Sequence, residues 1–274
     1  MGADRNCRIR LLALALLTLA VLAAVALLPP LPQAQRYHDF ADQRAALGVP
    51  LAWNVASNLG FVLVGAFAAW RLHQGRASFV DPRERLPYLL FFYSIAAVGL
   101  GSACYHWAPG NERLFWDRLP MSLAFMSLFS AVLVERVGLH IGLRLFPWLV
   151  MAGPLSVAYW LLSERAGAGD LRPYAVVHLL PLLLMPLLMA LFAPRYTRGA
   201  GLLQALALYV TALAAERLDH EIFALGGWIS GHTLKHILAA LAAAWLWRML
   251  SRRQSVPSPP ASDQGRAQRS AKGS

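Results

Sequence analysis

The sequence contains little cysteine and little charge. Only two of its 274 residues are cysteines, and only 14% are Asp, Glu, Lys or Arg. Cys7 precedes all apolar sequence and Cys104 lies inside an apolar segment, so a scaffold held by disulfides is excluded. Soluble globular domains carry about 25% charged residues. The scarcity of charge therefore argues against an ordinary soluble domain.

What the sequence has in excess is apolar residues, at 58% of the chain. A helix needs about 20 apolar residues to cross the hydrocarbon core of a bilayer. Eight segments approach this length, and none shows the period-two alternation of a transmembrane β-strand. They are Leu11–Leu28, Ala52–Leu72, Tyr88–Trp107, Trp116–Val134, Leu143–Ser163, Tyr174–Ala193, Leu202–Leu218 and Gly231–Leu250. The predicted fold class is an all-α integral membrane protein.

The connections between these segments are mostly short, which favours one compact bundle over several domains. Residues 52–250 form the predicted seven-helix core, and residues 29–51 form an outer loop before it. Residues 1–28 are predicted as an extra N-terminal transmembrane helix or an overlong signal segment, since RNCRIR precedes an 18-residue apolar run. Residues 251–274 are rich in Ser, Pro and Gly and predict a disordered cytoplasmic tail.

The net charge of +11 reflects arginines that lie between the apolar segments. Positive flanks are retained in the cytoplasm, so the side with more of them is the inner side. With the N-terminus inside, fourteen arginines between Arg5 and Arg253 flank the inner ends of the spans. The outer flanks hold seven: Arg36, Arg44, Arg113, Arg118, Arg165, Arg172 and Arg217. Both termini are therefore predicted to be cytoplasmic, with anionic lipid headgroups rather than nucleic acid as partners of the basic side chains.

Ionisable residues inside the spans gather at one end of the predicted bundle. His106 ends the third span, Asp117 begins the fourth, and His232 and His236 open the eighth. In the predicted topology all four fall at the outer end. Ionisable side chains inside a membrane are costly unless paired or hydrated, so each marks a candidate functional site.

The spacing of the histidines predicts a metal site. His232 and His236 are four residues apart and lie on one face of a helix. His106 supplies a third ligand at the same depth, and an open fourth position is typical of catalytic zinc. Ser102 lies four residues before His106 on the same face, whereas Cys104 lies about 200° round the helix and is excluded.

Simpler interpretations exist for each of these residues. The two histidines of an HxxxH pattern can hydrogen-bond between helices. Asp117 can stabilise the start of its helix or pair with Arg118, and Ser102 can be a small-residue helix contact. Lys235 can extend its amine towards water or pair with Glu216 or Asp219.

Further polar residues on the outer side are candidates to orient the metal-bound imidazoles. They are His178, Glu216, Asp219, His220 and Glu221. For His220 and Glu221 we favour a solvated helix end.

Three sequence blocks together resemble the alkaline ceramidases, membrane amide hydrolases of the CREST superfamily of seven-helix proteins. The blocks are WNVASN at 53–58, GLGSACYHWAPGNERLFWDRLPM at 99–121 and GHTLKHILAAL at 231–241. The middle block is the most specific, because Ser and His four residues apart precede an Asp and then Leu-Pro-Met. The resemblance covers about residues 36–250.

This resemblance implies that His106, His232 and His236 bind zinc, that Ser102 stabilises an oxyanion and that Asp117 transfers protons. The implied activity is hydrolysis of the amide bond of ceramide or a similar N-acyl lipid taken from the bilayer. The composition, rich in Ala, Leu and Arg, and the segment YHDFADQR at 37–44 indicate a bacterial member in an inner membrane, with its metal site towards the outer face.

The chain also departs from the family pattern. Leu51 stands where eukaryotic members carry a glutamate of a calcium site, and Asp39, Asp42 and Asn54 offer oxygen ligands at a different spacing. A calcium site is therefore not assigned. Arg118 replaces a glutamate that is common after the catalytic aspartate, which leaves the identity of the cleaved lipid open.

Two other functions compete with hydrolysis. A seven-helix lipid receptor or scaffold of the same superfamily would use the metal as a structural element. A transporter is weaker, because no inverted repeat or pair of broken helices is evident. Three imidazoles also suit copper, iron and nickel, and the sequence does not give the oligomeric state.

Overall fold

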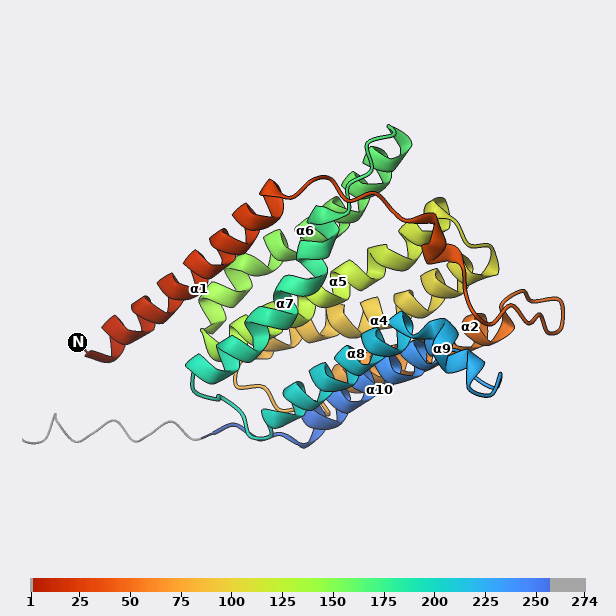
Figure 1. Ribbon diagram of the computed structural model, residues 1–274. Coiled ribbons are helices and arrows are strands. Elements are labelled where there is room, and N and C mark those ends of the chain that lie inside the picture. Colours follow the sequence, from red (N-terminus) through yellow and green to blue (C-terminus); the bar gives the residue numbers. More distant parts are fainter. Residues whose placement is uncertain (1, 257–274) are drawn as a thin grey trace, which may run out of the picture.

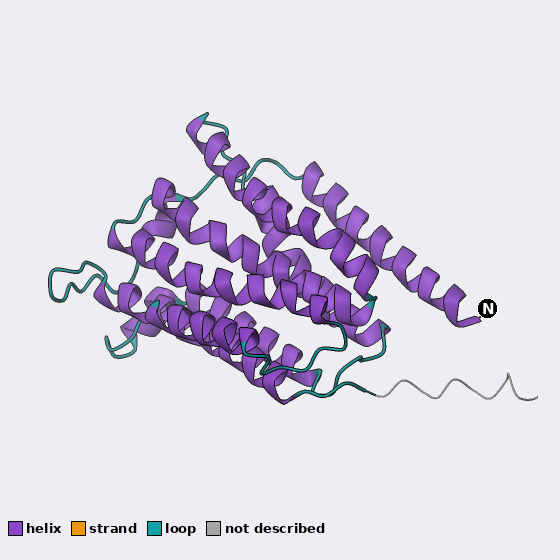
Figure 2. Cartoon of the chain, turned by 180° about the vertical axis from the view of Figure 1, so that it is seen from behind, coloured by secondary structure: helices purple, strands orange, loops and turns teal. Residues whose placement is uncertain are grey.

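The computed structural model describes residues 2–256, so most of the predicted tail, residues 257–274, lies outside the described residues. Within residues 2–256 the chain forms helices and no named strand, as the composition predicts (Figures 1 and 2). The helices are α1 (Gly2–Leu27), α2 (Ala52–Ser57), α3 (Leu59–His73), α4 (Arg85–Trp107), α5 (Asn111–Arg136), α6 (Leu139–Arg165), α7 (Arg172–Leu191), α8 (Ala200–Arg217), α9 (Asp219–Ala224) and α10 (Gly231–Arg252), with short 3-10 turns η1 (Gln35–His38) and η2 (Pro82–Glu84).

Six helical segments are long and apolar enough to cross a membrane, which is compatible with a multi-pass membrane protein. They are α1, the continuous pair α2 and α3, α4, α5, α6 and α7. The remaining long helices, α8 and α10, have 18 and 22 residues. Their composition is more polar, because α8 ends in Glu216 and Arg217 and α10 opens with two histidines and Lys235.

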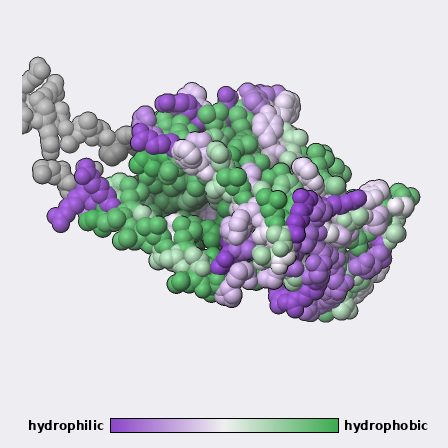
Figure 3. All heavy atoms as spheres, turned by 90° about the horizontal axis from the view of Figure 1, so that it is seen from above, coloured by the Kyte–Doolittle hydropathy of each residue, from purple (hydrophilic) through white to green (hydrophobic). Residues whose placement is uncertain are grey.

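The surface of the helices exposes many apolar side chains, as expected for contact with lipid. Large apolar side chains are exposed along the helices, including Leu100, Trp148 and Leu162. Figure 3 shows apolar residues over much of the visible face between the ends, and hydrophilic residues gathered at the end where α2 and α9 lie in Figure 1. An exposed apolar band of this kind suits lipid better than water.

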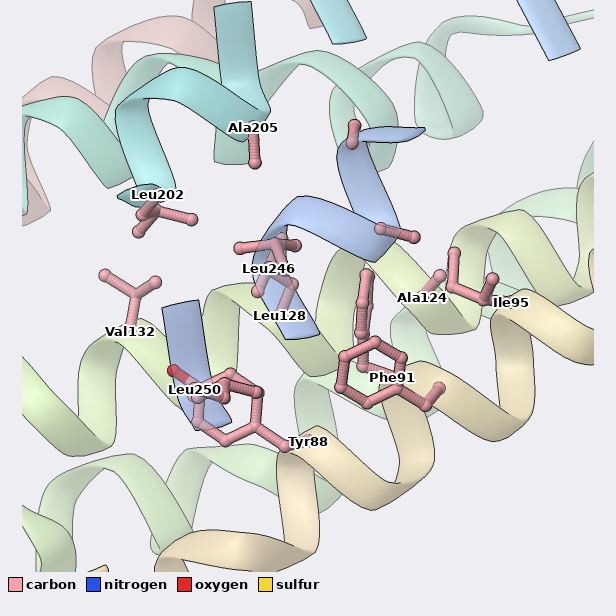
Figure 4. Close-up of a cluster of buried hydrophobic side chains, with 14 of the residues drawn as sticks. Tyr88, Phe91, Ile95, Ala124, Leu128, Val132, Leu202, Ala205, Leu246 and Leu250 are labelled. Atoms are coloured by element: carbon pink, nitrogen blue, oxygen red, sulfur yellow. The ribbon is translucent and has the colours of Figure 1, made fainter. Parts of the chain in front are cut away.

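The main core lies where α3, α4, α5, α8 and α10 meet. Phe92 and Leu250 are fully buried there, with many smaller side chains around them. Figure 4 shows members of this cluster from α4, α5, α8 and α10 pointing towards one another. This packing brings α10, the last helix of the chain, against helices from its first half, which is the condition for any site that combines them.

The first helix lies along α7 at the edge of the bundle, where Cys7, Leu11 and Leu14 pack against the core cluster. Its C-terminal end is held by Arg172, whose Nη1 donates to the carbonyl of Ala26 at 3.2 Å and also to that of Leu28. Arg10 donates to the Leu191 carbonyl at 2.5 Å near the other end. Arginine hydrogen bonds near both ends and partly buried apolar side chains thus attach this helix to the bundle.

The end of the bundle that holds the C-terminus of α10 contains a buried ion pair. Arg253 pairs with Glu135 and its guanidinium carbon lies 3.9 Å from the centre of the Tyr196 ring. Backbone hydrogen bonds continue this contact, from Thr197 N to Gln254 O and from Val256 N to Arg195 O, both at 2.9 Å. Residues 251–256, where the predicted tail begins, therefore pack against the bundle.

Candidate metal centre

Three histidines from two helices converge at the end of the bundle near α2 and α9. His106 lies in the last turn of α4, and His232 and His236 lie in the first turns of α10. Their side chains are almost inaccessible, with exposed fractions of 1%, 4% and 3% for the residues. One candidate ligand atom from each lies within 4.8 Å of the others. The buried triad can therefore hold a metal ion.

The spacing of the nitrogens fits a tetrahedral ion. His106 Nε2 and His232 Nε2 are 3.1 Å apart, whereas two imidazole nitrogens bound to one zinc at about 2.0–2.1 Å are separated by about 3.3 Å. The ring centres of His236 lie 5.0 Å from His106 and 4.8 Å from His232, so the third ligand completes the same cluster. Three protein ligands leave a fourth position for water or substrate, as in catalytic zinc sites.

Hydrogen bonds around His236 fix which ring nitrogen is free. Its Nδ1 lies 2.8 Å from Ser57 Oγ at the end of α2, and Ser57 Oγ donates its own proton to the Asn54 carbonyl at 3.0 Å. The serine hydroxyl must then accept from His236 Nδ1–H, which leaves Nε2 unprotonated for a metal. Such partners orient metal-bound imidazoles and typically set the affinity.

The start of α10 is fixed by its neighbours. Ser230 Oγ accepts from Thr233 N at 3.1 Å and so caps the helix. Asp219 Oδ1 accepts from His232 N at 2.6 Å. A Cβ on Gly231 would lie 2.1 Å from the carbonyl oxygen of Ala215, so only glycine permits this approach of α10 to α8. The close contact places His232 opposite His106.

A second close contact places Asp117. Pro120 in α5 has no N–H to donate to the carbonyl of Trp116, one turn back. Gly101 of α4 approaches this carbonyl so closely that a Cβ would lie 2.1 Å from its oxygen. The residues that follow, Ser102 and Asp117, are both buried and hydrogen-bonded to each other. Gly101 and Ser102 of α4 and Pro120 of α5, all in the same sequence block, thus allow close packing of α4 against α5.

Charged partners surround this pair. Lys235 is buried, and its Nζ donates to Glu216 Oε1, so of the predicted alternatives pairing with Glu216 is the one observed. Tyr37 OH also donates to Glu216 Oε1, at 3.2 Å. Glu216 Oε1 lies 3.8 Å from His232 Nδ1, too far for a hydrogen bond but close enough to favour a proton on that nitrogen. The predicted alternative of an Asp117 pair with Arg118 is not formed, since Arg118 donates to Gln33 instead.

A mostly apolar cavity runs from this cluster into the core. Its polar wall consists of Ser102, Asp117, Lys235 and His236. The rest is lined by apolar side chains of α3, α4, α5, α7, α8 and α10, several of which are drawn in Figure 4. We call this space the apolar cavity.

The segment after η1 covers the histidines from the loop side. The ring of Phe40 packs 4.7 Å from the centre of His106 and 4.6 Å from that of His232. Ala41 N donates to Asp219 Oδ2 at 2.9 Å, and His38 Nδ1 lies 2.8 Å from Tyr105 OH. The loop between α1 and α2 therefore shields the site from water.

The other sequence candidates lie elsewhere. His178 contacts Tyr209 OH at 2.6 Å and stacks on Phe125, away from the triad. His220 is exposed and Cys104 is exposed. Among the oxygen ligands considered for calcium, Asp42 is taken by Arg44, Asn54 Oδ1 accepts from Thr233 Oγ1 at 2.7 Å, and Asp39 is exposed.

Two residues of the site escaped the sequence analysis. Ser57 lies inside the block WNVASN, but nothing in the spacing shows that it faces a histidine 179 residues later. Phe40 belongs to a loop without a periodic sequence pattern from which its position could be predicted.

Comparison of the chain with protein-family models, curated proteins and solved structures finds no match. Its function must therefore be argued from the geometry of this site.

Proposed function

We propose that the protein is a zinc-dependent membrane amide hydrolase that cleaves the N-acyl bond of ceramide or a similar lipid amide. One observation carries the proposal: a buried triad of histidines adjoins a hydrogen-bonded Ser–Asp pair at the polar end of the apolar cavity. This combination offers a metal site with an open position, a proton acceptor and space for an acyl chain. It also agrees with the resemblance of the sequence blocks to the alkaline ceramidases.

His106, His232 and His236 would hold the metal. Zinc at such a site supplies a nucleophile at neutral pH and polarises a carbonyl group as a Lewis acid. The chain itself supplies the orientation, because Ser57 and Asp219 fix the two histidines of α10 and Phe40 excludes bulk water.

Asp117 and Ser102 would manage the protons and the charge of the reaction. Asp117 accepts a proton from the attacking water and returns it to the nitrogen of the leaving amine as the C–N bond breaks. The Ser102 hydroxyl turns from the carboxylate to the oxygen of the former carbonyl, where it donates a hydrogen bond to the developing negative charge. The products are a fatty acid and an amine.

The apolar cavity would take the acyl chain. Leu182 and Met185 of α7 and Ala205 and Leu206 of α8 form part of its wall. The main neighbours of α7 are α5 and α6, whereas those of α8 are α10 and α9, so α7 and α8 meet chiefly across the cavity. A lipid therefore enters sideways from the bilayer between these two helices.

The membrane arrangement forms part of this proposal. We place α2 to α10 as a seven-helix core, with α1 as an additional N-terminal span or signal segment, in a bacterial inner membrane. Support for spans at α8 and α10 comes from Leu203, Val210 and Leu241, which are exposed apolar residues on the outside of these helices. The arginine distribution supports an arrangement with both termini in the cytoplasm and the metal centre near the outer face.

The experiment compares metal content and amidase activity of detergent-purified protein. The unaltered chain is expected to carry about one zinc per chain and to release fatty acid from an N-acyl lipid. The double variant His232→Ala, His236→Ala is expected to lose both. Asp117→Asn is expected to keep the metal and lose the activity.

Two outcomes would contradict the proposal. An Asp117→Asn protein with full activity would remove the proton-transfer role. A protein that binds zinc but hydrolyses no N-acyl lipid, and loses thermal stability on chelation, would instead identify a receptor or scaffold with a structural metal.

A further inference from the structure

A second cavity meets the apolar cavity at the proposed reaction site. Apolar side chains such as Leu31, Leu171 and Leu213 form part of its wall, and it also holds a group of polar residues that includes Tyr37, Asp117, Arg118, Tyr174, Glu216 and Lys235. We call it the polar cavity. Asp117 and Lys235 line both cavities. If the acyl half of an amide lies in the apolar cavity with its carbonyl at the metal centre, the amine half extends into the polar cavity.

The guanidinium of Arg118 is the unusual group in this cavity. The residue is 5% exposed, and its Nη2 donates to Gln33 Oε1 at 2.7 Å. Three aromatic rings hold the plane of the guanidinium, with centres 4.4 Å away for Trp160, 5.0 Å for Tyr174 and 5.3 Å for Tyr37. In the described part of the chain, its buried Nη1 has no hydrogen-bond partner.

The carboxylates near Arg118 have other hydrogen-bond partners. Glu216 is paired with Lys235, and Asp117 is hydrogen-bonded to Ser102. Within residues 2–256 no salt bridge joins Arg118 to a carboxylate, although the carboxylate of Asp117 in the same cavity attracts it electrostatically. The hydrogen bond of Arg118 goes to a neutral amide, and its guanidinium lies against aromatic rings. A buried charged donor without a partner is costly and calls for an explanation.

A ligand anion supplies that explanation. Arginine binds carboxylate and phosphate through two parallel hydrogen bonds, and its rigid fork loses little freedom when it does so. The aromatic rings keep the guanidinium oriented before the ligand arrives, and Gln33 occupies only one nitrogen. Arg118 is one of the residues that line the cavity that would hold the amine half.

We propose that Arg118 binds an oxyanion, a carboxylate or a phosphate, on the amine half of the substrate. The preferred lipid is then an N-acyl amino acid or an N-acyl amine phosphate rather than neutral ceramide. This inference rests on the proposed function and names its substrate class. Water adds to the amide carbon, the C–N bond breaks and the proton passes to nitrogen, so an N-acyl amino acid gives a fatty acid and a free amino acid.

The test uses lipids that share one acyl chain and one amide. N-Oleoylglycine carries a carboxylate, N-oleoylethanolamine carries a neutral hydroxyl in its place, and its O-phosphate carries a phosphate. Dissociation constants are measured in detergent on zinc-loaded Asp117→Asn protein, in which turnover is stopped. Hydrolysis rates are measured on the chain with Asp117 intact. Arg118→Gln removes the anion partner, and Arg217→Gln is the control, because Arg217 is an exposed arginine of α8 outside the polar cavity.

We expect one of the anionic lipids to bind about 10- to 100-fold more tightly than the neutral lipid, the range of a hydrogen bond between charged groups. The tighter of the two anions identifies the group. Arg118→Gln is expected to abolish the preference by weakening the anionic lipid alone, and Arg217→Gln to preserve it.

The results separate the inference from the proposed function. Equal affinities for all three lipids in folded, zinc-loaded protein would overturn the role of Arg118, even if Arg118→Gln does not fold. Hydrolysis of all three lipids at similar rates would also refute the role of Arg118, but it would support the proposed amidase activity. A clear preference for an anion without any hydrolysis would retain the anion site and refute the amidase.

Discussion

Substitution of Gly231 by alanine tests whether the approach of α10 to α8 builds the metal centre. The new Cβ would lie 2.1 Å from the Ala215 carbonyl oxygen and 2.7 Å from the Asp219 Cα, whereas ordinary contacts begin near 3.4 Å. The start of α10 must therefore move by about 1.3 Å, which is the difference between an ordinary contact of 3.4 Å and the 2.1 Å from the Cβ to the Ala215 carbonyl oxygen. His232 is the next residue, so its imidazole moves with the backbone.

That displacement is large on the scale of a metal bond. Metal–ligand distances tolerate changes of about 0.2 Å, and His232 Nε2 starts only 3.1 Å from His106 Nε2. We expect Gly231→Ala to lower zinc affinity by about 100-fold, at the upper end of the effect of removing a residue that supports a metal ligand. The overpacked contact is also expected to lower stability by about 1–3 kcal/mol.

The assay is competitive zinc titration against a chromophoric chelator, with thermal unfolding in the same detergent. Gly110→Ala is the matched control, since nothing lies within 4 Å of its Cβ and its backbone φ of 169° is extended and open to any residue. If Gly231→Ala binds zinc as tightly as the Gly110→Ala protein, the triad does not depend on this helix contact and the reasoning fails.

The remaining predictions probe other supports of the site and of the fold. In Gly101→Ala the new Cβ would lie 2.1 Å from the Trp116 carbonyl oxygen. We expect this variant to retain zinc but to have an amidase kcat about 100-fold lower, because the substitution displaces the proton acceptor Asp117 by about 1 Å. An unchanged kcat would refute this prediction. Ser57→Ala removes the acceptor of His236 Nδ1–H and is expected to weaken zinc binding about 10-fold, as zinc titration would show. The guanidinium of Arg172 is hydrogen-bonded to Asp170 and lowers the pKa of that carboxyl from its ordinary 3.8 to about 2. The ionised carboxylate therefore stabilises the fold by about 1–2 kcal/mol above pH 4, and this contribution disappears as the pH falls towards 2. Thermal unfolding of Asp170→Asn should therefore show a deficit at pH 7 that vanishes near pH 2, and a constant deficit would count against it.

The helical nature of the protein followed from its sequence. Long apolar segments with arginine at their ends can satisfy their backbone hydrogen bonds in a membrane only as helices, and the structure is helical throughout its named elements. Composition alone was less decisive for α8 and α10, because the histidines, Lys235 and Glu216 that build the site make these helices more polar. The number of spans stays a prediction.

The three histidines of the candidate metal centre could also be predicted from the sequence. Residues four apart on a helix must share a face, so His232 and His236 form a pair whatever surrounds them. His106 followed from the order of the spans, which placed it at the same end. Local periodicity and topology were enough for these three residues.

The tertiary structure alone decided what surrounds them. Ser57 contacts His236, Phe40 covers the imidazoles and Arg118 donates to Gln33 because of how the helices cross and how the loop between α1 and α2 folds back. These partners are 66 to 192 residues apart along the chain, and no periodic pattern encodes such contacts. Their positions depend on close approaches at Gly101 and Gly231, which set the register between helices to within about an ångström. Spacing along one helix fixes a ligand pair, whereas the packing between helices determines its environment.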